Sequence, residues 1–120
     1  MKYLLLIHTN PANWAVMSEQ ERNALLGEYT AFNKEITDSG ELVDGAPLGD
    51  ASTATTVRVR GGQREVTDGP FIESKEHLAG YYLVDCENLD RAIALAERIP
   101  DARFSGVEVR PVMDMGGVEM

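Results

Sequence analysis

The residues best suited to acid-base chemistry cluster between positions 68 and 76. Asp68 is a candidate general acid or base, provided that partial burial raises its pKa towards neutrality. Glu73 beside Asp68 is a further catalytic candidate, and Lys75 is suited to binding an anionic substrate. A structural explanation stands beside this one, because Asp-Gly-Pro is a turn sequence and a loop of mixed charges is often merely solvated. In that explanation Phe71 anchors the turn in the core.

Further candidates lie at the ends of predicted strands. His8 ends the first strand and Asp44 follows the second, so the two side chains are expected to pair across a cleft. Neither His8 nor His77 has a second histidine at metal-ligand spacing, and the chain has no glycine-rich phosphate loop or nucleophile elbow. We therefore expect no metal and no cofactor, although carboxylates brought together by folding remain an alternative metal site.

Composition limits the classes of function. The 120 residues form one domain over 1–120, and the single cysteine, Cys86, excludes an intrachain disulfide. A net charge of −9 opposes the neutralisation of phosphates, so nucleic acid is not an expected partner. The longest apolar run near the start, Tyr3 to Ile7, is too short to cross a membrane. The sequence predicts a cytoplasmic protein with no membrane contact.

Periodicity and capping residues predict the elements that must position these side chains. Ser18 and Glu21 form a capping box, and apolar residues then recur at helical spacing up to Ile36, which predicts a helix over Glu19–Ser39. Gly61-Gly62 between two strand-like runs predicts a β-hairpin, with one exposed face that carries Arg58, Arg60 and Arg64. The other expected elements are strands at Lys2–Thr9, around Leu42 and Val43, at Gly80–Cys86 and at Gly106–Met113, and a helix between Asn88 and Pro100.

Without the hairpin, the predicted order of elements is βαββαβ. This is the α+β ferredoxin-like plan, in which two helices cover one face of an antiparallel sheet. The strands carry apolar residues on both faces, and a chain of 120 residues has no helix left for the second face. We therefore predict that two copies pack their sheets together as a homodimer. The apolar stripe on the first helix includes Tyr29, for which both a core position and a site position are open.

The chain resembles the YCII-related family in its branch with an Asp-Gly-Pro-Phe (DGPF) motif. The likeness extends over almost the whole chain. It is carried by the opening MKYLLLIH, Thr67 to Phe71, Leu78 to Leu83, the start of the second helix at Leu89 to Ala92, and Val107 to Val112. The resemblance implies a ferredoxin-like dimer that forms an α/β barrel with a cleft beside it.

The resemblance also bears on the site. Related lyases and dehydrochlorinases use a His-Asp pair, and the position of that histidine falls near Tyr29 in this chain. The Tyr29 hydroxyl would then point into the cleft and donate a hydrogen bond to a substrate carbonyl, with Tyr82 as a further ligand-binding residue. The branch implies a small-molecule-binding or regulatory accessory protein, encoded in relatives beside sigma factors. A lyase or isomerase using Asp68, a glutamate and Tyr29 is the alternative, and the expected ligand is small and either acidic or carbonyl-containing.

Overall fold

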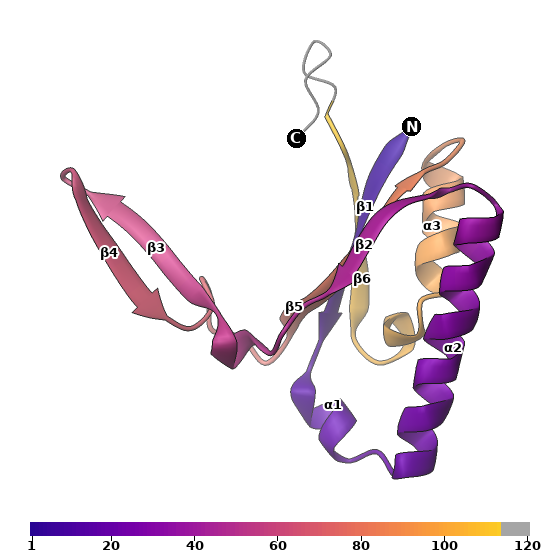
Figure 1. Ribbon diagram of the computed structural model, residues 1–120, viewed down its shortest axis with the longest axis horizontal. Coiled ribbons are helices and arrows are strands. Elements are labelled where there is room, and N and C mark those ends of the chain that lie inside the picture. The colour runs from indigo at the N-terminus through magenta and orange to yellow at the C-terminus, as the bar shows by residue number, and fades with distance from the viewer. Residues whose placement is uncertain (114–120) are drawn as a thin grey trace.

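The computed structural model describes residues 1–113. Four strands form one antiparallel sheet in the order β2-β5-β1-β6, and β3 and β4 form a separate two-stranded hairpin. Figure 1 shows the sheet between the helices on one side and the hairpin on the other. The elements are β1 (Lys2–Thr9), α1 (Pro11–Ala15), α2 (Glu19–Asp38), β2 (Leu42–Pro47), η1 (Ala51–Thr53), β3 (Thr55–Arg60), β4 (Gln63–Asp68), β5 (His77–Asp85), α3 (Leu89–Glu97), η2 (Pro100–Arg103) and β6 (Gly106–Pro111).

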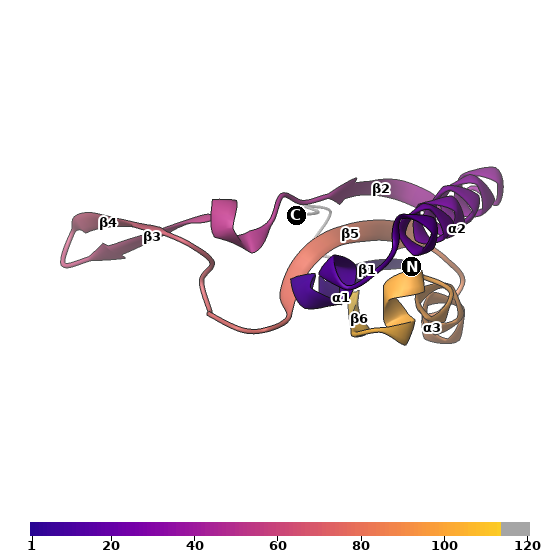
Figure 2. The ribbon, with the colours of Figure 1, turned by 90° about the horizontal axis from the view of Figure 1, so that it is seen from below.

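The core lies between one face of the sheet and helices α2 and α3. Alternate residues of β1 are buried there, since successive side chains of a strand point to opposite faces. The buried apolar residues are Tyr3, Leu5, Ile7, Leu25, Phe32, Ile36, Tyr82, Val84, Cys86, Ala92, Leu95, Ala96 and Ile99. An α+β chain with two helices on one face of an antiparallel sheet is therefore present, consistent with the predicted ferredoxin-like plan (Figure 2).

Local signals account for most of the element boundaries. The predicted capping box is formed: the Glu21 N–H donates to the Ser18 hydroxyl, and the Ser18 N–H donates to the Glu21 carboxylate. The short helix α1 was not predicted, because Asn10 and Pro11 are turn residues as well as helix-starting residues. Here the Asn10 side chain accepts a hydrogen bond from the Ala12 N–H and Pro11 occupies the first turn.

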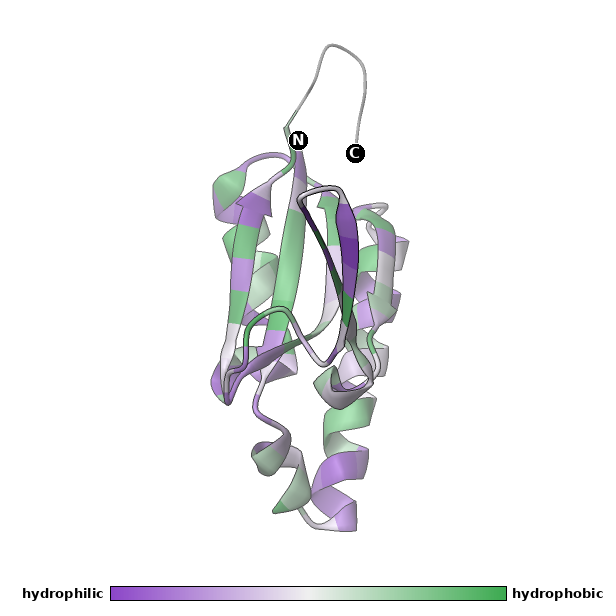
Figure 3. Ribbon diagram, turned by 90° about the vertical axis from the view of Figure 1, so that its left-hand side faces the viewer, coloured by the Kyte–Doolittle hydropathy of each residue, from purple (hydrophilic) through white to green (hydrophobic). Residues whose placement is uncertain are grey.

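The opposite face of the sheet, which we call the open face, is not covered by any helix of the described residues. Leu4 and Leu6 of β1 lie on it, opposite Leu83 and Tyr81 of β5, and all four side chains are half-exposed. Figure 3 looks onto this face, with β1 largely in the hydrophobic colour. Helices long and apolar enough to cross a membrane are not found among residues 1–113.

The β3–β4 hairpin, residues 55–68, projects away from the sheet on the side of the open face and is called the arm below (Figures 1 and 3). Two predictions about it are wrong. Phe71 is not anchored in the core: 69% of it is exposed, and the Arg58 guanidinium lies over its ring at 4.9 Å. Arg64 does not share a face with Arg58 and Arg60, because it pairs with Val59 in the hairpin register.

Candidate functional site

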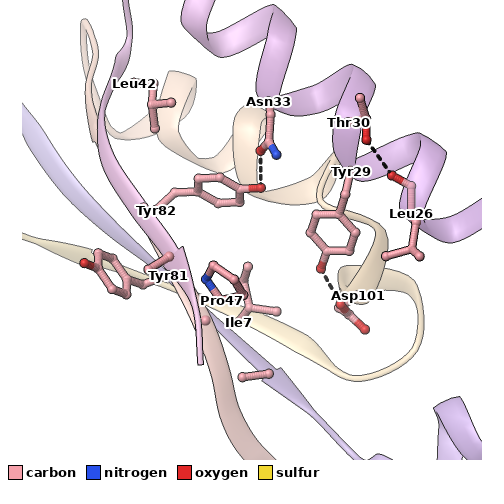
Figure 4. A pocket seen from close by; sticks show the side chains of 14 residues that line it. Ile7, Leu26, Tyr29, Thr30, Asn33, Leu42, Pro47, Tyr81, Tyr82 and Asp101 are labelled. Carbon is pink, nitrogen blue, oxygen red and sulfur yellow. Dashed lines mark hydrogen bonds between the residues drawn. The ribbon is translucent and has the colours of Figure 1, made fainter. Parts of the chain in front are cut away.

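A cavity of about 610 Å³ lies between α2 and the β2–β5 edge of the sheet. Four residues of α2 form one wall, strands β1, β2 and β5 form the opposite wall, and η2 closes one end (Figure 4). Most of the lining is apolar, including Ile7, Leu26, Leu42 and Pro47. Its size lies within the range of small-molecule sites, which are mostly apolar with a few placed polar groups.

The first polar group of the cavity is the pair formed by Tyr29 and Asp101. Helical spacing places Tyr29 on the sheet-facing side of α2, and the turn of η2 after Pro100 brings Asp101 beside it. The Tyr29 hydroxyl donates a hydrogen bond to Asp101 Oδ2. Burial raises the pKa of Tyr29 well above its ordinary value of 10.0, and the hydrogen bond and negative charge of Asp101 raise it further. Tyr29 therefore keeps its proton at neutral pH and acts as a hydrogen-bond donor, not as a base.

Tyr82 and Asn33 form the second polar group. The Tyr82 hydroxyl donates to Asn33 Oδ1, and the Tyr82 ring meets Phe32 edge to face with the centroids 5.4 Å apart. Burial raises the pKa of Tyr82. A glycine makes room for the ring: a Cβ atom at position 45 would lie 2.9 Å from Tyr82 Cδ1. These two pairs supply two phenols, one amide and one carboxylate, and Thr30 and Tyr81 also line the cavity.

Of the predicted site residues, Tyr29 and Tyr82 line this cavity. Asp68 is the last residue of β4, and Glu73 and Lys75 lie in the exposed loop that leads from the arm to β5. Two hydrogen bonds at Gly69 hold the turn after Asp68: the Gly69 N–H donates to Ala54 O, and the Thr56 hydroxyl donates to Gly69 O. Within one chain, Asp68, Glu73 and Lys75 are therefore not among the residues that line the cavity with Tyr29.

His8 and Asp44 lie on the open face, on strands that are not neighbours in the sheet. His8 Nε2 is 3.4 Å from Glu108 Oε1 on β6. Asp44 accepts hydrogen bonds from the Gly45 N–H at 2.8 Å and from the Tyr81 hydroxyl at 3.4 Å. The expected pairing of His8 with Asp44 is therefore not formed in the chain, because β5 lies between β1 and β2 in the strand order.

Sequence reasoning missed Asn33 and Asp101. Asn33 follows Tyr29 by four residues, so the helix places both side chains on one face, and this signal was available. Asp101 is 72 residues from Tyr29 and lies in a short 3-10 turn that no sequence pattern predicted. No cluster of three or more His, Cys, Asp or Glu suited to a metal ion is found among residues 1–113.

Comparison with known proteins relates this arrangement to others. The model of the YCII-related domain matches residues 1–116. The chain belongs to the YCII-related family. An uncharacterized protein of Rhizobium meliloti (strain 1021) is 33% identical over 114 residues, which are 93% of this chain and 92% of the relative.

One solved structure extends the comparison to three dimensions. It is 5-chloro-2-hydroxyhydroquinone dehydrochlorinase from Burkholderia phenoliruptrix AC1100, in complex with 2,5-dihydroxybenzoquinone. The similarity has a TM-score of 0.53 and covers 96% of both chains, with 13% identical residues. At this identity the likeness shows that the two proteins share a fold, and it does not bear on the reaction of this YCII-related protein.

Proposed function

We propose that this YCII-related protein binds a small, uncharged compound with a carbonyl or phenolic oxygen in the cavity beside α2. The observation that carries the proposal is the pair Tyr29–Asp101 on the wall of an otherwise largely apolar cavity of about 610 Å³. The phenol retains its proton, and its one O–H, which donates to Asp101 in the free protein, can turn to donate to a ligand oxygen instead. The binding or regulatory function expected from the sequence agrees with this arrangement.

The ligand class follows from the charges around the cavity. The Asp101 carboxylate lies on the wall, and the whole chain carries a net charge of −9, so a carboxylate ligand would meet repulsion. Of the two expected ligand types, acidic and carbonyl-containing, this supports the carbonyl-containing one. The fold relative with a bound hydroxylated quinone supports a small ring compound.

We further propose that the protein forms a dimeric α/β barrel, that it belongs to the DGPF branch of its family, and that it is located in the cytoplasm. The support for a homodimer is the open face, whose leucines Leu4, Leu6 and Leu83 remain half-exposed in a single chain. Two such faces packed together would bury these side chains and place His8 and Asp44 in or near the interface. Asp68, Glu73 and Lys75 would take part in a site only where a second copy brings their loop to it.

A second candidate is an enzyme of the lyase or isomerase type, which the Tyr29–Asp101 geometry favours. In that function the Asp101 carboxylate accepts a proton from the carbon next to a substrate carbonyl. Tyr29 turns its hydroxyl from Asp101 to the carbonyl oxygen and stabilises the charge that develops there. A direct test is exchange of the methyl protons of 4-hydroxyacetophenone in D₂O, followed by NMR. Acceleration by the wild type that is lost in Asp101→Asn supports the enzyme, and equal rates with and without protein exclude this chemistry for the probe.

Calorimetric titration with a matched pair of ligands tests the binding proposal. Methyl 4-hydroxybenzoate is neutral and 4-hydroxybenzoate carries a carboxylate, while the two rings are the same. We expect the ester to bind more tightly than the acid, and Tyr29→Phe to weaken the ester about tenfold through the lost hydrogen bond. Asp101→Asn should reduce the difference in affinity between the ester and the acid. Equal affinity of the wild type for ester and acid would contradict the proposed role of the Asp101 charge.

A further inference from the structure

We propose that the arm of one copy packs its valine face against a second copy of the chain. The valine face consists of Val57, Val59 and Val66. The inference rests on the homodimer proposed above and adds the arm as a second contact, separate from the open face of the sheet.

The register of the hairpin gives the arm two different faces. Val57 is opposite Val66, and Val59 is opposite Arg64, so the three valines and Arg64 point to the same side. Arg58 opposite Glu65 and Arg60 opposite Gln63 point to the other side. Antiparallel strands with one apolar and one polar face normally bury the apolar one.

Within its own chain the valine face is uncovered. The exposed fractions are 58% for Val57, 68% for Val59 and 55% for Val66. The opposite face is the one that the chain itself contacts, through the Phe71 ring under Arg58 and the hydrogen bond from Thr56 to Gly69. A two-stranded hairpin alone is at best marginally stable in water, so an arm of this kind needs a partner for its apolar side.

The shape of the chain supports a second copy as that partner. The arm leaves the body on the side of the open face (Figure 1), and the radius of gyration is 16.4 Å, against about 14 Å for a compact chain of this length. Strands of six residues are about 20 Å long, whereas packed sheets lie only about 10 Å apart. An arm of this length therefore reaches across the sheet of a second copy that sits on the open face.

Charge acts in the same direction. The arm carries three arginines, Arg58, Arg60 and Arg64, against the two acidic residues Glu65 and Asp68, in a chain whose net charge is −9. The surface outside the arm is accordingly strongly acidic, and a second copy presents that surface to the arm. Arg64 lies on the valine face and forms no ion pair among residues 1–113, so it is placed to meet a carboxylate of the other copy.

The test compares dimer dissociation constants by sedimentation equilibrium. The variant Val57→Thr, Val59→Thr, Val66→Thr keeps the shape and β-propensity of the arm but makes its valine face polar. Its matched control is Val16→Thr, a valine 83% exposed at the end of α1. We expect the arm variant to raise the dissociation constant about tenfold or more, because both arms of a symmetric dimer lose apolar burial, and the control to leave it unchanged.

Hydrogen exchange of the wild type gives a measurement that needs no variant. The arm amides should be protected in proportion to the dimer population as the protein concentration is raised, while the protection of β1 core amides is high throughout. Unprotected arm amides in a fully dimeric sample, or an unchanged dissociation constant in the arm variant, would overturn the inference and leave the dimer itself intact. A wild type that is monomeric at all concentrations overturns both the dimer and the arm contact, whereas ester binding in the cavity is judged separately by calorimetry.

Discussion

The hydrogen bond between Tyr29 and Asp101 makes a quantitative prediction for stability. It joins a phenol to a carboxylate, both half-buried, across 72 residues of sequence. A hydrogen bond to a charged group contributes about 1.5–3 kcal/mol, and partial access of water to Asp101 reduces the value. In a double-mutant cycle of Tyr29→Phe and Asp101→Ala, we therefore expect a coupling free energy of about 1–2 kcal/mol.

The assay is equilibrium unfolding in urea at pH 7, with the wild type, both single variants and the double variant at one protein concentration. Tyr82 supplies the matched control, since its hydroxyl donates to Asn33 and not to Asp101. The cycle of Tyr82→Phe with Asp101→Ala should give a coupling below about 0.5 kcal/mol. Equal coupling in the two cycles, or coupling near zero in the first, would refute the assignment of Asp101 as the partner of Tyr29.

Three further predictions concern pH and packing. Arg91 holds the pKa of Glu41 below its usual value of 4.5 by a bidentate hydrogen bond, so the free energy of unfolding should fall as the pH drops below about 4.5, and it should fall less in Glu41→Gln. An equal fall of the unfolding free energy in the wild type and in Glu41→Gln would contradict the ion pair. Above pH about 10, the unfolded chain releases the Tyr29 proton that the folded chain keeps, so this group should lower the free energy of unfolding by up to about 1.4 kcal/mol per pH unit. The decrease with pH should be shallower in Tyr29→Phe, and an equal decrease in both proteins, measured by urea unfolding, would count against burial of the phenol. Gly45→Ala should lower the free energy of unfolding by about 1–3 kcal/mol, because the new Cβ lies 2.9 Å from the Tyr82 ring. An unchanged midpoint of urea unfolding would show that the structure relaxes to relieve this contact.

Local signals predicted the local structure well. The capping box at Ser18 and Glu21 sets the start of α2, and the predicted helix end at Ser39 differs from the observed end at Asp38 by one residue. Gly61 and Gly62 both have positive φ at the hairpin turn, as the Gly-Gly signal indicated. These features depend on neighbours within a few residues, which a single sequence displays directly.

The candidate site was only partly predictable, because it depends on distant contacts. Tyr29 and Tyr82 were identified as site residues, yet their positions followed from the resemblance and the strand pattern and not from their partners. Asp101 reaches Tyr29 through a short turn after Pro100, which the sequence marked only as the end of a helix. Phe71 was expected to anchor its turn in the core, but it lies in the loop that leads from the projecting arm to β5 and is exposed.

The central claim is that the cavity beside α2 holds a small neutral ligand through Tyr29. The most direct measurement is a crystal structure of the protein soaked with methyl 4-hydroxybenzoate, accompanied by the same soak of Tyr29→Phe. We predict density for the ester between α2 and β2, with one of its oxygens within hydrogen-bond distance of the Tyr29 hydroxyl, and weaker density in the variant. An empty cavity at saturating ester, or ester bound only elsewhere on the protein, would contradict the account.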